Sequence, residues 1–493
     1  MNRPPNTRRA DLVRIATEAM TERGLEPEFP EAVAHQLAAI GGPGGTDREV
    51  DARIQDLTAL PWCSIDNDDS RDLDQLTACE LLPDGEVKIF VAIADVDALV
   101  GKGTAIDEHA RFNTTSVYTA ARIFPMLPER LSTDLSSLNP GQERLALVTE
   151  LRIAADDTVL QSTVGRARVH NKAKLAYDST AAWIDGAAAL PAPAAAVPGM
   201  DQQLRTQDQV AQRLRVRRHA AGALDFETLQ PRAVYEGERV VEIRQQVQNR
   251  ARQLIEELMI ATNQATARFL AEHGGASLRR VVRSPERWQR IVAEARKYGE
   301  ALPGQPDSRA LELFLARRRK ADPLRFPDLS LVIVKLMGSG EYVVEQPGTA
   351  PVGHFGLAVR DYTHSTAPNR RFPDLITLRL LKAALAGQPP PYTATELAAL
   401  AAHCSQQEDA AQKVERKLRK CEAALLLESH VGQRYDGVIT GRSEHDTWVR
   451  VFAPPVEGKL TGRVPELDIG QRVHVKLVST DVERGFIDFV LLD

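Results

Sequence analysis

The sequence predicts an α+β protein of more than one domain, and three observations carry this prediction. At 493 residues, the chain is longer than one hydrophobic core usually accommodates. Asp84 and Gly85 lie between two apolar, alternating runs, which is the pattern of a β-hairpin. Residues 249–274 and 395–430 instead repeat their apolar side chains with helical spacing. A part rich in strands therefore precedes a part rich in helices.

The first 50 residues predict a small helical domain. Leu12, Ile15 and Met20 follow helical spacing, and Gly24 offers a stop. A second helical segment, 29–42, ends at a pair of glycines. This unit is either helix-turn-helix-like or a plain helical cap on the next domain, and the sequence leaves both open.

Residues 51–430 are expected to form the main domain. Its aspartate-rich segment connects two strands of the predicted sheet, with Asp66 at the end of one and Asp74 at the start of the next. Residues 185–199 are rich in alanine and proline and predict a loop or linker. The helical stretches 249–274, 374–388 and 395–430 follow.

The last 63 residues, 431–493, predict a small closed β-barrel of the OB-fold type, because short alternating strands are separated there by Gly, Pro and Asp. Trp448, Arg450 and Phe452 share one strand face. Such a face can be a platform that stacks single-stranded bases. Equally, one aromatic ring can be buried and the other incidental.

Composition limits the classes of partner. Lysine and arginine total 62 against 67 acidic residues, a net charge of −5, so a nucleic acid would have to meet local basic runs such as 213–222, 277–283 and 315–320. The four cysteines are scattered without a CxxC pair, which gives no sign of a zinc site or a disulfide framework. Neither a signal peptide nor a membrane-spanning stretch is apparent, so we expect a cytoplasmic protein without membrane association.

The segment CSIDNDDSRDLDQL, 63–76, concentrates aspartates at positions 66, 68, 69, 72 and 74. Like charges this close repel one another, so the loop either faces water or holds cations. It lacks the glycine and glutamate of an EF-hand. Carboxylate oxygens suit Mg²⁺ or Mn²⁺, and two such ions could cleave a phosphodiester. Spacing alone does not decide between this chemistry and a solvated acidic loop.

Further motifs follow this segment in a fixed order. They are VAIADV (91–96), TSVY (115–118), PMLPERLS (125–132), SSLNP (136–140), KAKLAYD (172–178), GALDF (222–226), LIEELMIATN (254–263), GHFGLA (353–358), YTHSTAPNRRFPDL (362–375) and RLLKA (379–383). Together with SIDNDDSRDLDQL they resemble the RNB domain of the ribonuclease II / ribonuclease R exoribonuclease family. The resemblance covers roughly residues 55–430 and implies an RNB catalytic domain followed by the OB-fold domain that closes many members.

The resemblance implies a metal site and a catalytic arginine. Asp66, Asp72 and Asp74 match the family's metal-binding and catalytic aspartates. Gln75 stands where the family has a fourth carboxylate; its amide oxygen can still bind Mg²⁺ or Mn²⁺, but with one negative charge fewer. Arg370 matches the arginine that faces the scissile phosphate, where a guanidinium fork stabilises developing negative charge. The choice of Arg370 over the adjacent Arg371 rests on the register of the match.

The resemblance also implies the residues that hold RNA. Tyr118 and Phe226 match aromatic residues on the two sides of the terminal bases, although a core position is the common fate of such rings. Tyr177 and Glu256 match residues near the ribose, where the 2′-OH distinguishes RNA from DNA. Glu415 matches a glutamate close to the 3′ nucleotide, or it pairs with Arg419 one helical turn away.

From these matches we expect a metal-dependent 3′-to-5′ exoribonuclease that degrades single-stranded RNA processively to nucleoside 5′-monophosphates, as a monomer. The alternative is an RNA-binding protein of the same fold whose catalysis is weakened by Gln75. A DNA exonuclease is a more distant alternative.

Overall fold

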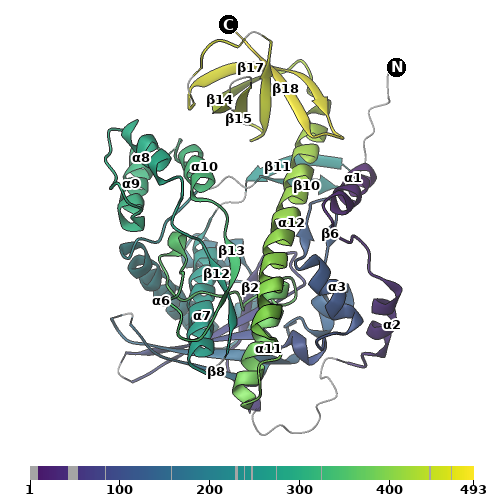
Figure 1. The fold of residues 1–493 in the computed structure, drawn as a ribbon, viewed down its shortest axis with the longest axis vertical. Helices are drawn as coiled ribbons and strands as arrows, with labels where there is room; N and C mark the ends of the chain where they lie inside the picture. Colours follow the sequence, from purple (N-terminus) through teal and green to yellow (C-terminus); the bar gives the residue numbers. More distant parts are fainter. Residues whose placement is uncertain are drawn as a thin grey trace.

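The structure of this chain is a computed structural model. It describes residues 9–42, 54–83, 85–156, 158–227, 231–237, 239–245, 248–273, 275–323, 325–443, 446–462, 464–467 and 469–492. A body of sheet and helices lies at one end, a small barrel lies at the other, and the long helix α12 (Ala394–Glu428) runs between them (Figure 1). The predicted α+β class and the terminal barrel are confirmed.

The centre of the main domain is a seven-stranded mixed sheet with the order β1-β8-β7-β4-β3-β2-β9. Its strands are β1 (Ile54–Asp56), β2 (Cys63–Asp66), β3 (Gln75–Leu81), β4 (Val87–Ala94), β7 (Glu143–Ile153), β8 (Val159–His170) and β9 (Ala173–Ala176). Strands β3 and β4 pair antiparallel, which confirms the predicted hairpin, although Asp84 lies outside the described residues. Strand β4 is apolar on both faces because it is central and covered on each side.

Helices cover this sheet and shape the space beside it. Helix α7 (Arg250–His273) packs across β2, β4, β7 and β8. Helix α11 (Phe372–Ala386) packs against α7; Pro373 lies in its first turn, where a missing N–H is tolerated, and Gly387 ends it with a φ of 64°. The Thr393 side chain caps α12 by accepting from the Glu396 N–H.

Shorter elements complete the domain. They are α3 (Ala105–Asn113), β5 (Val117–Tyr118), β6 (Ile123–Phe124), a turn of π-helix (Arg130–Leu135), α4 (Tyr177–Ile184), α5 (Ala192–Ala195), α6 (Met200–Ala220), β10 (Pro231–Glu236), β11 (Arg239–Gln245), β12 (Ser277–Val281), α8 (Trp288–Arg296), α9 (Ser308–Ala321), α10 (Phe326–Met337) and β13 (Glu341–Glu345). The predicted loop at 185–199 thus contains one short helix, α5. No helix of the described segments is both long and apolar enough to cross a membrane.

The terminal barrel closes in the order β14-β15-β16-β18-β17. Its strands are β14 (Arg434–Arg442), β15 (Thr447–Val451), β16 (Glu457–Thr461), β17 (Arg472–Asp481) and β18 (Phe486–Leu491). Gly458 permits close packing there, because a Cβ would lie 2.6 Å from the Phe489 ring. Arg450 reaches back to the main domain and pairs with Asp328 of α10 at 2.7 Å.

The N-terminal helices α1 (Arg9–Glu22) and α2 (Glu31–Ala39) pack on the main domain. Leu12, Ile15 and Met20 share one buried cluster with Val117 of β5 and Leu418 of α12. Helix α1 therefore packs directly behind two elements that, as shown below, carry residues of the candidate site.

We expect Ile15→Ala to lower the stability of the protein by about 2–4 kcal/mol, since it would leave a cavity in this shared cluster. Chemical denaturation measures the change in the free energy of unfolding. Amide hydrogen exchange should also become faster in residues 117–124. Glu18→Ala, on the exposed face of α1, is the matched control and should change little. Equal effects of the two substitutions would contradict this expectation.

Candidate active site

Strand register brings the predicted carboxylates to one edge of the sheet. Strand β2 ends at Asp66, and β3 begins at Gln75, so the aspartate-rich segment is the connection between two strands. Parallel pairing with β9 places Asp66 opposite Ala176. The next residue, Tyr177, therefore lies beside the end of β2.

A cavity of about 650 Å³ lies over this edge of the sheet. Seven residues that the sequence predicted line it: Asp66, Asp72, Gln75, Tyr118, Tyr177, Arg370 and Glu415. They come from five separate stretches of the chain. The structure thus gathers most of the predicted site around one space.

Asp74 lies behind the cavity wall and is tied to Arg370. The carboxylate is 1% exposed; it accepts from the Arg370 Nε at 3.1 Å and from the Asn369 backbone N–H at 2.9 Å. Burial raises the pKa of Asp74 to about 7, Arg370 opposes that rise, and the negative charge of Asp72 adds to it. A carboxylate in this position needs a cation to remain ionised.

The neighbouring arginine points elsewhere. Arg371 pairs with Asp374 of its own segment at 2.8 Å, and Arg370 lines the cavity. Of the two arginines, Arg370 is therefore the one that pairs with Asp74 and lines the cavity with Asp66 and Asp72.

Asp66 and Asp72 line the cavity itself. Asp66 Oδ1 accepts from the Asn67 N–H at 2.7 Å and from the Ser70 hydroxyl at 2.9 Å. Burial raises the pKa of Asp66, these two hydrogen bonds and Arg370 oppose the rise, and Asp72 adds to it. The hydroxyl of Tyr118 donates to Asp72 Oδ2 at 2.9 Å. The aspartates thus repel one another electrostatically inside one cavity.

These residues fit a divalent cation in part. Their oxygen donors suit Mg²⁺ or Mn²⁺, and a cation would relieve the mutual repulsion. Within the described residues, however, no group of three His, Cys, Asp or Glu side chains is arranged to hold an ion alone. Asp74 is engaged with Arg370, which leaves Asp66, Asp72 and the amide of Gln75 as the set that could share an ion with a substrate phosphate.

Helix α12 forms the opposite wall. Glu415 Oε1 accepts from the backbone N–H of Tyr118 at 3.0 Å, and burial raises the pKa of Glu415. One and two turns along, Arg419 and Glu422 also line the cavity. Arg419 donates to the Glu415 backbone carbonyl at 3.3 Å, and its charge opposes the rise in the pKa of the Glu415 carboxyl.

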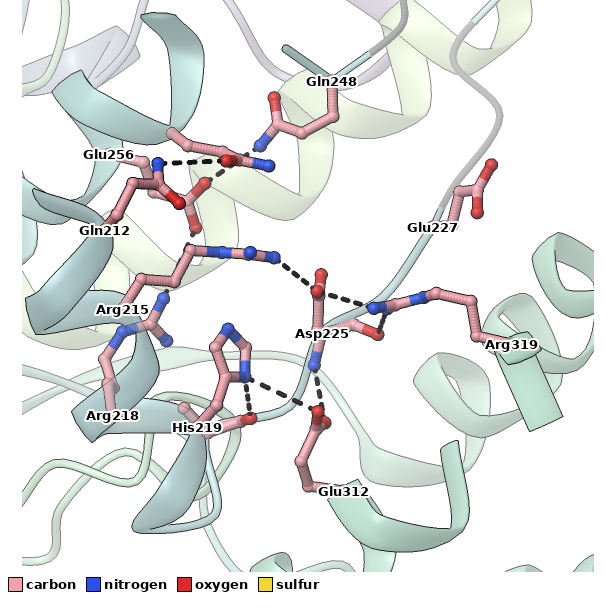
Figure 2. Close-up of polar contacts among 12 residues, drawn as sticks. Gln212, Arg215, Arg218, His219, Asp225, Glu227, Gln248, Glu256, Glu312 and Arg319 are labelled. Atoms are coloured by element: carbon pink, nitrogen blue, oxygen red, sulfur yellow. Dashed lines mark hydrogen bonds and ion pairs between the residues drawn. The ribbon is translucent and has the colours of Figure 1, made fainter. Parts of the chain in front are cut away.

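Two predicted residues lie outside this cavity. Phe226 packs against the apolar cluster of α8, α9 and α10, where its ring is partly buried. Glu256 accepts from Gln248 at 3.0 Å and turns toward Arg218 of α6. Figure 2 shows this separate polar cluster, in which Asp225 lies between Arg215 and Arg319. Neither residue lines the cavity of the aspartates, so the contacts of Phe226 with a terminal base and of Glu256 with the ribose stay predictions.

The barrel residues stay a prediction. Phe452 is exposed just beyond β15, with Arg472 over its ring at 5.9 Å, and Trp448 is half-buried. Arg450, however, forms an ion pair with Asp328. Because Arg450 pairs with Asp328, a base-stacking platform on this strand would depend on Trp448 and Phe452, and it stays a prediction.

Sequence reasoning missed Arg252 and Glu422, which both line the cavity. Arg252 shares one face of α7 with Ile255 and Met259, so a charge at apolar helical spacing was the available signal. Glu422 is 2% exposed and accepts from the Tyr235 hydroxyl at 3.4 Å. No local pattern distinguishes it from other glutamates of α12.

A family model for the RNB domain matches residues 54–387. The chain belongs to the RNB domain exoribonuclease family. A second model, the RNase II-type exonuclease C-terminal S1 domain, matches residues 433–492, which is the barrel. The RNB match contains the β2–β3 loop, Tyr118, Tyr177 and Arg370, so most of the cavity belongs to the RNB domain, whereas Glu415 lies between the two matches.

Curated relatives agree with this assignment. The chain is 30% identical to ribonuclease R of Escherichia coli over 94% of its length and 60% of that protein, and 27% identical to ribonuclease R 1 of Lactococcus lactis over 96% and 60%. The chain therefore spans about three-fifths of the length of these relatives.

Solved structures share the fold. The apo form of Mycoplasma genitalium RNase R superposes with a TM-score of 0.87 at 24% identity, covering 98% of this chain and 78% of that one. The same protein has been solved with ribose-methylated single-stranded RNA and with double-stranded RNA. Yeast Ssd1, described as a pseudonuclease, has a TM-score of 0.73 at 16% identity, covering 94% of this chain and 57% of that one.

We expect Glu422→Gln to change how stability depends on pH. Burial raises the pKa of Glu422 to about 7, while hydrogen bonds from Tyr235 and from the backbone at Ala120 and Ala121 oppose the rise. The folded protein therefore binds a proton here between about pH 4.5 and 7 that the unfolded chain does not, and wild-type stability falls as pH rises through this window.

The Gln variant should lack this fall, so its stability relative to wild type should increase by about 1–3 kcal/mol between pH 5 and pH 8. Denaturation at both pH values measures the difference. Glu428→Gln, at the end of the same helix, is the control. A pH-independent difference would contradict the buried, proton-binding role of Glu422.

Proposed function

We propose that this chain is a metal-dependent 3′-to-5′ exoribonuclease that degrades single-stranded RNA processively to nucleoside 5′-monophosphates. The observation that carries the proposal is the convergence of Asp66, Asp72 and the Asp74–Arg370 pair at one cavity of an RNB domain. We further propose that it acts as a monomer in the cytoplasm.

In the proposed reaction, water attacks the phosphorus of the last linkage, and the bond from phosphorus to the 3′ oxygen of the preceding nucleotide breaks. The released nucleotide keeps its 5′-phosphate, and the shortened RNA keeps a 3′-hydroxyl. A divalent cation, when bound by Asp66, Asp72 and the Gln75 amide oxygen, would supply positive charge to the phosphate and lower the pKa of water.

The residues of the chain have separate roles in this scheme. Arg370 offers N–H donors to the phosphate as negative charge builds, and Asp74 holds the guanidinium in place through its Nε. The Tyr118 ring stands at the wall where the strand end would lie, fixed by Asp72 and Glu415. Aromatic stacking suits a substrate of any sequence.

A specific observation supports the second candidate, an RNA-binding protein with weakened catalysis. Gln75 is neutral and lines the cavity in place of a carboxylate. A protein described as a pseudonuclease shares the fold, so the fold by itself does not guarantee catalysis.

We expect Asp74→Asn to lower the rate of RNA cleavage at least about 100-fold, because it removes the charge that orients Arg370. A 5′-labelled single strand incubated with Mg²⁺ or Mn²⁺ should give a ladder or a short end product with wild type and intact RNA with the variant. Asp409→Asn, on the exposed side of α12, is the control.

Wild-type protein that retains RNA tightly without shortening it would favour the binding protein. A deoxy strand of the same sequence, run in parallel, tests the DNA exonuclease alternative.

We expect Gln75→Asp to tighten Mg²⁺ or Mn²⁺ binding on the order of tenfold, because it adds one negative charge to the ligand set. Calorimetric titration of the metal without RNA measures this separately from activity. Unchanged or weaker binding would show that position 75 does not contribute to a metal site.

A further inference from the structure

Arg252 is the charged residue of α7 that lines the active-site cavity, together with Ile255 and Met259. Glu256 and Glu257 turn instead to Arg218, toward the separate cluster of Figure 2. The helix thus directs its acidic residues away from the cavity and one guanidinium into it.

Two of the contacts of that guanidinium orient it at the cavity wall. Its carbon lies 4.3 Å from the centre of the Tyr177 ring, and its Nη2 donates to Asn67 Oδ1 at 3.0 Å. Stacking engages the flat face of a guanidinium, whereas its N–H donors lie in the plane around its edge, the geometry that recognises phosphate.

The Arg252 guanidinium lies in a cavity that is lined by several carboxylates. Tyr177, Asp66, Arg252 and Arg370 all line the cavity. Burial raises the pKa of the Tyr177 hydroxyl, the charge of Asp66 adds to the rise, and Arg252 and Arg370 oppose it. The cavity also carries Asp72, Glu415 and Glu422, and it would repel a polyanion without nearby cations. Arg370 shares its charge with buried Asp74. Arg252 is one of three further arginines that line the cavity, with Arg71 and Arg419, and its charge can offset this repulsion for a phosphate chain.

We propose that Arg252, stacked on Tyr177, binds a backbone phosphate of the RNA strand beside the cleavage site. This inference rests on the proposed function in taking RNA as the ligand. The contact belongs to substrate binding and is made before the chemical step, so Arg252 is a binding residue that acts separately from the Asp74–Arg370 pair.

The test compares Arg252→Gln with Arg205→Gln. The guanidinium carbon of Arg205 lies over the Trp183 ring at 4.4 Å, but Arg205 is not among the residues that line the cavity, so it is a matched control. Binding of a fluorescent single-stranded RNA without divalent metal is measured by anisotropy over a range of salt concentrations.

Arg252→Gln should weaken binding about tenfold or more and reduce the slope of log K against log[salt] by about 0.7, the value for one phosphate contact on a single strand. With metal present, the KM should rise more than kcat falls. Arg205→Gln should match wild type in each measurement.

Asn67→Ala separates this role from a purely structural one. It removes the acceptor and keeps the guanidinium, so the salt slope should stay that of wild type. The proposal is overturned if Arg252→Gln behaves like Arg205→Gln, if Asn67→Ala reproduces its loss of slope, or if wild type binds no RNA. If wild type binds RNA but never shortens it, and Arg252→Gln still reduces the salt slope, the proposed exonuclease activity is overturned and the phosphate contact is supported.

Discussion

The ion pair between buried Asp74 and Arg370 is the constraint on which the site depends. Desolvating a carboxylate is costly, and the Asp74 pKa of about 7 shows that the cost is only partly offset. The pair joins residues 296 positions apart, one just before β3 and the other just before α11. It therefore fixes the aspartate-rich loop against the arginine segment, and neither can move without exposing an unpaired charge.

The opposite wall of the cavity depends on apolar packing. Helix α1 packs against β5 and α12 in one cluster, and these two elements carry Tyr118 and Glu415. Arg9 extends the contact by donating to the Ala121 carbonyl at 3.0 Å, and Glu28 pairs with Arg122 at 2.7 Å. The N-terminal helices thus support the β5–β6 segment, whose first strand holds Tyr118 over Asp72.

The barrel is fixed to this body at several points. Helix α12 leads into it, Ile243 of β11 joins its core, and Arg450 pairs with Asp328 of α10. On the other side, Glu483 pairs with Arg14 of α1 at 2.7 Å. Packing and charge therefore set where the barrel stands relative to the cavity. The ion pair with Asp328 engages Arg450, which the sequence had placed on one strand face with Trp448 and Phe452.

The sequence by itself determined the element types, the β3–β4 hairpin, the terminal barrel and the ordered motifs that contain the aspartates and the two adjacent arginines, because periodicity and motif order are local properties. Only the tertiary structure decided which of two adjacent arginines faces the carboxylates, and that Phe226 and Glu256 turn to other partners. It also brought Arg252 and Glu422 into the cavity. These outcomes depend on contacts between segments far apart in the chain, and such contacts leave no periodic trace in the sequence.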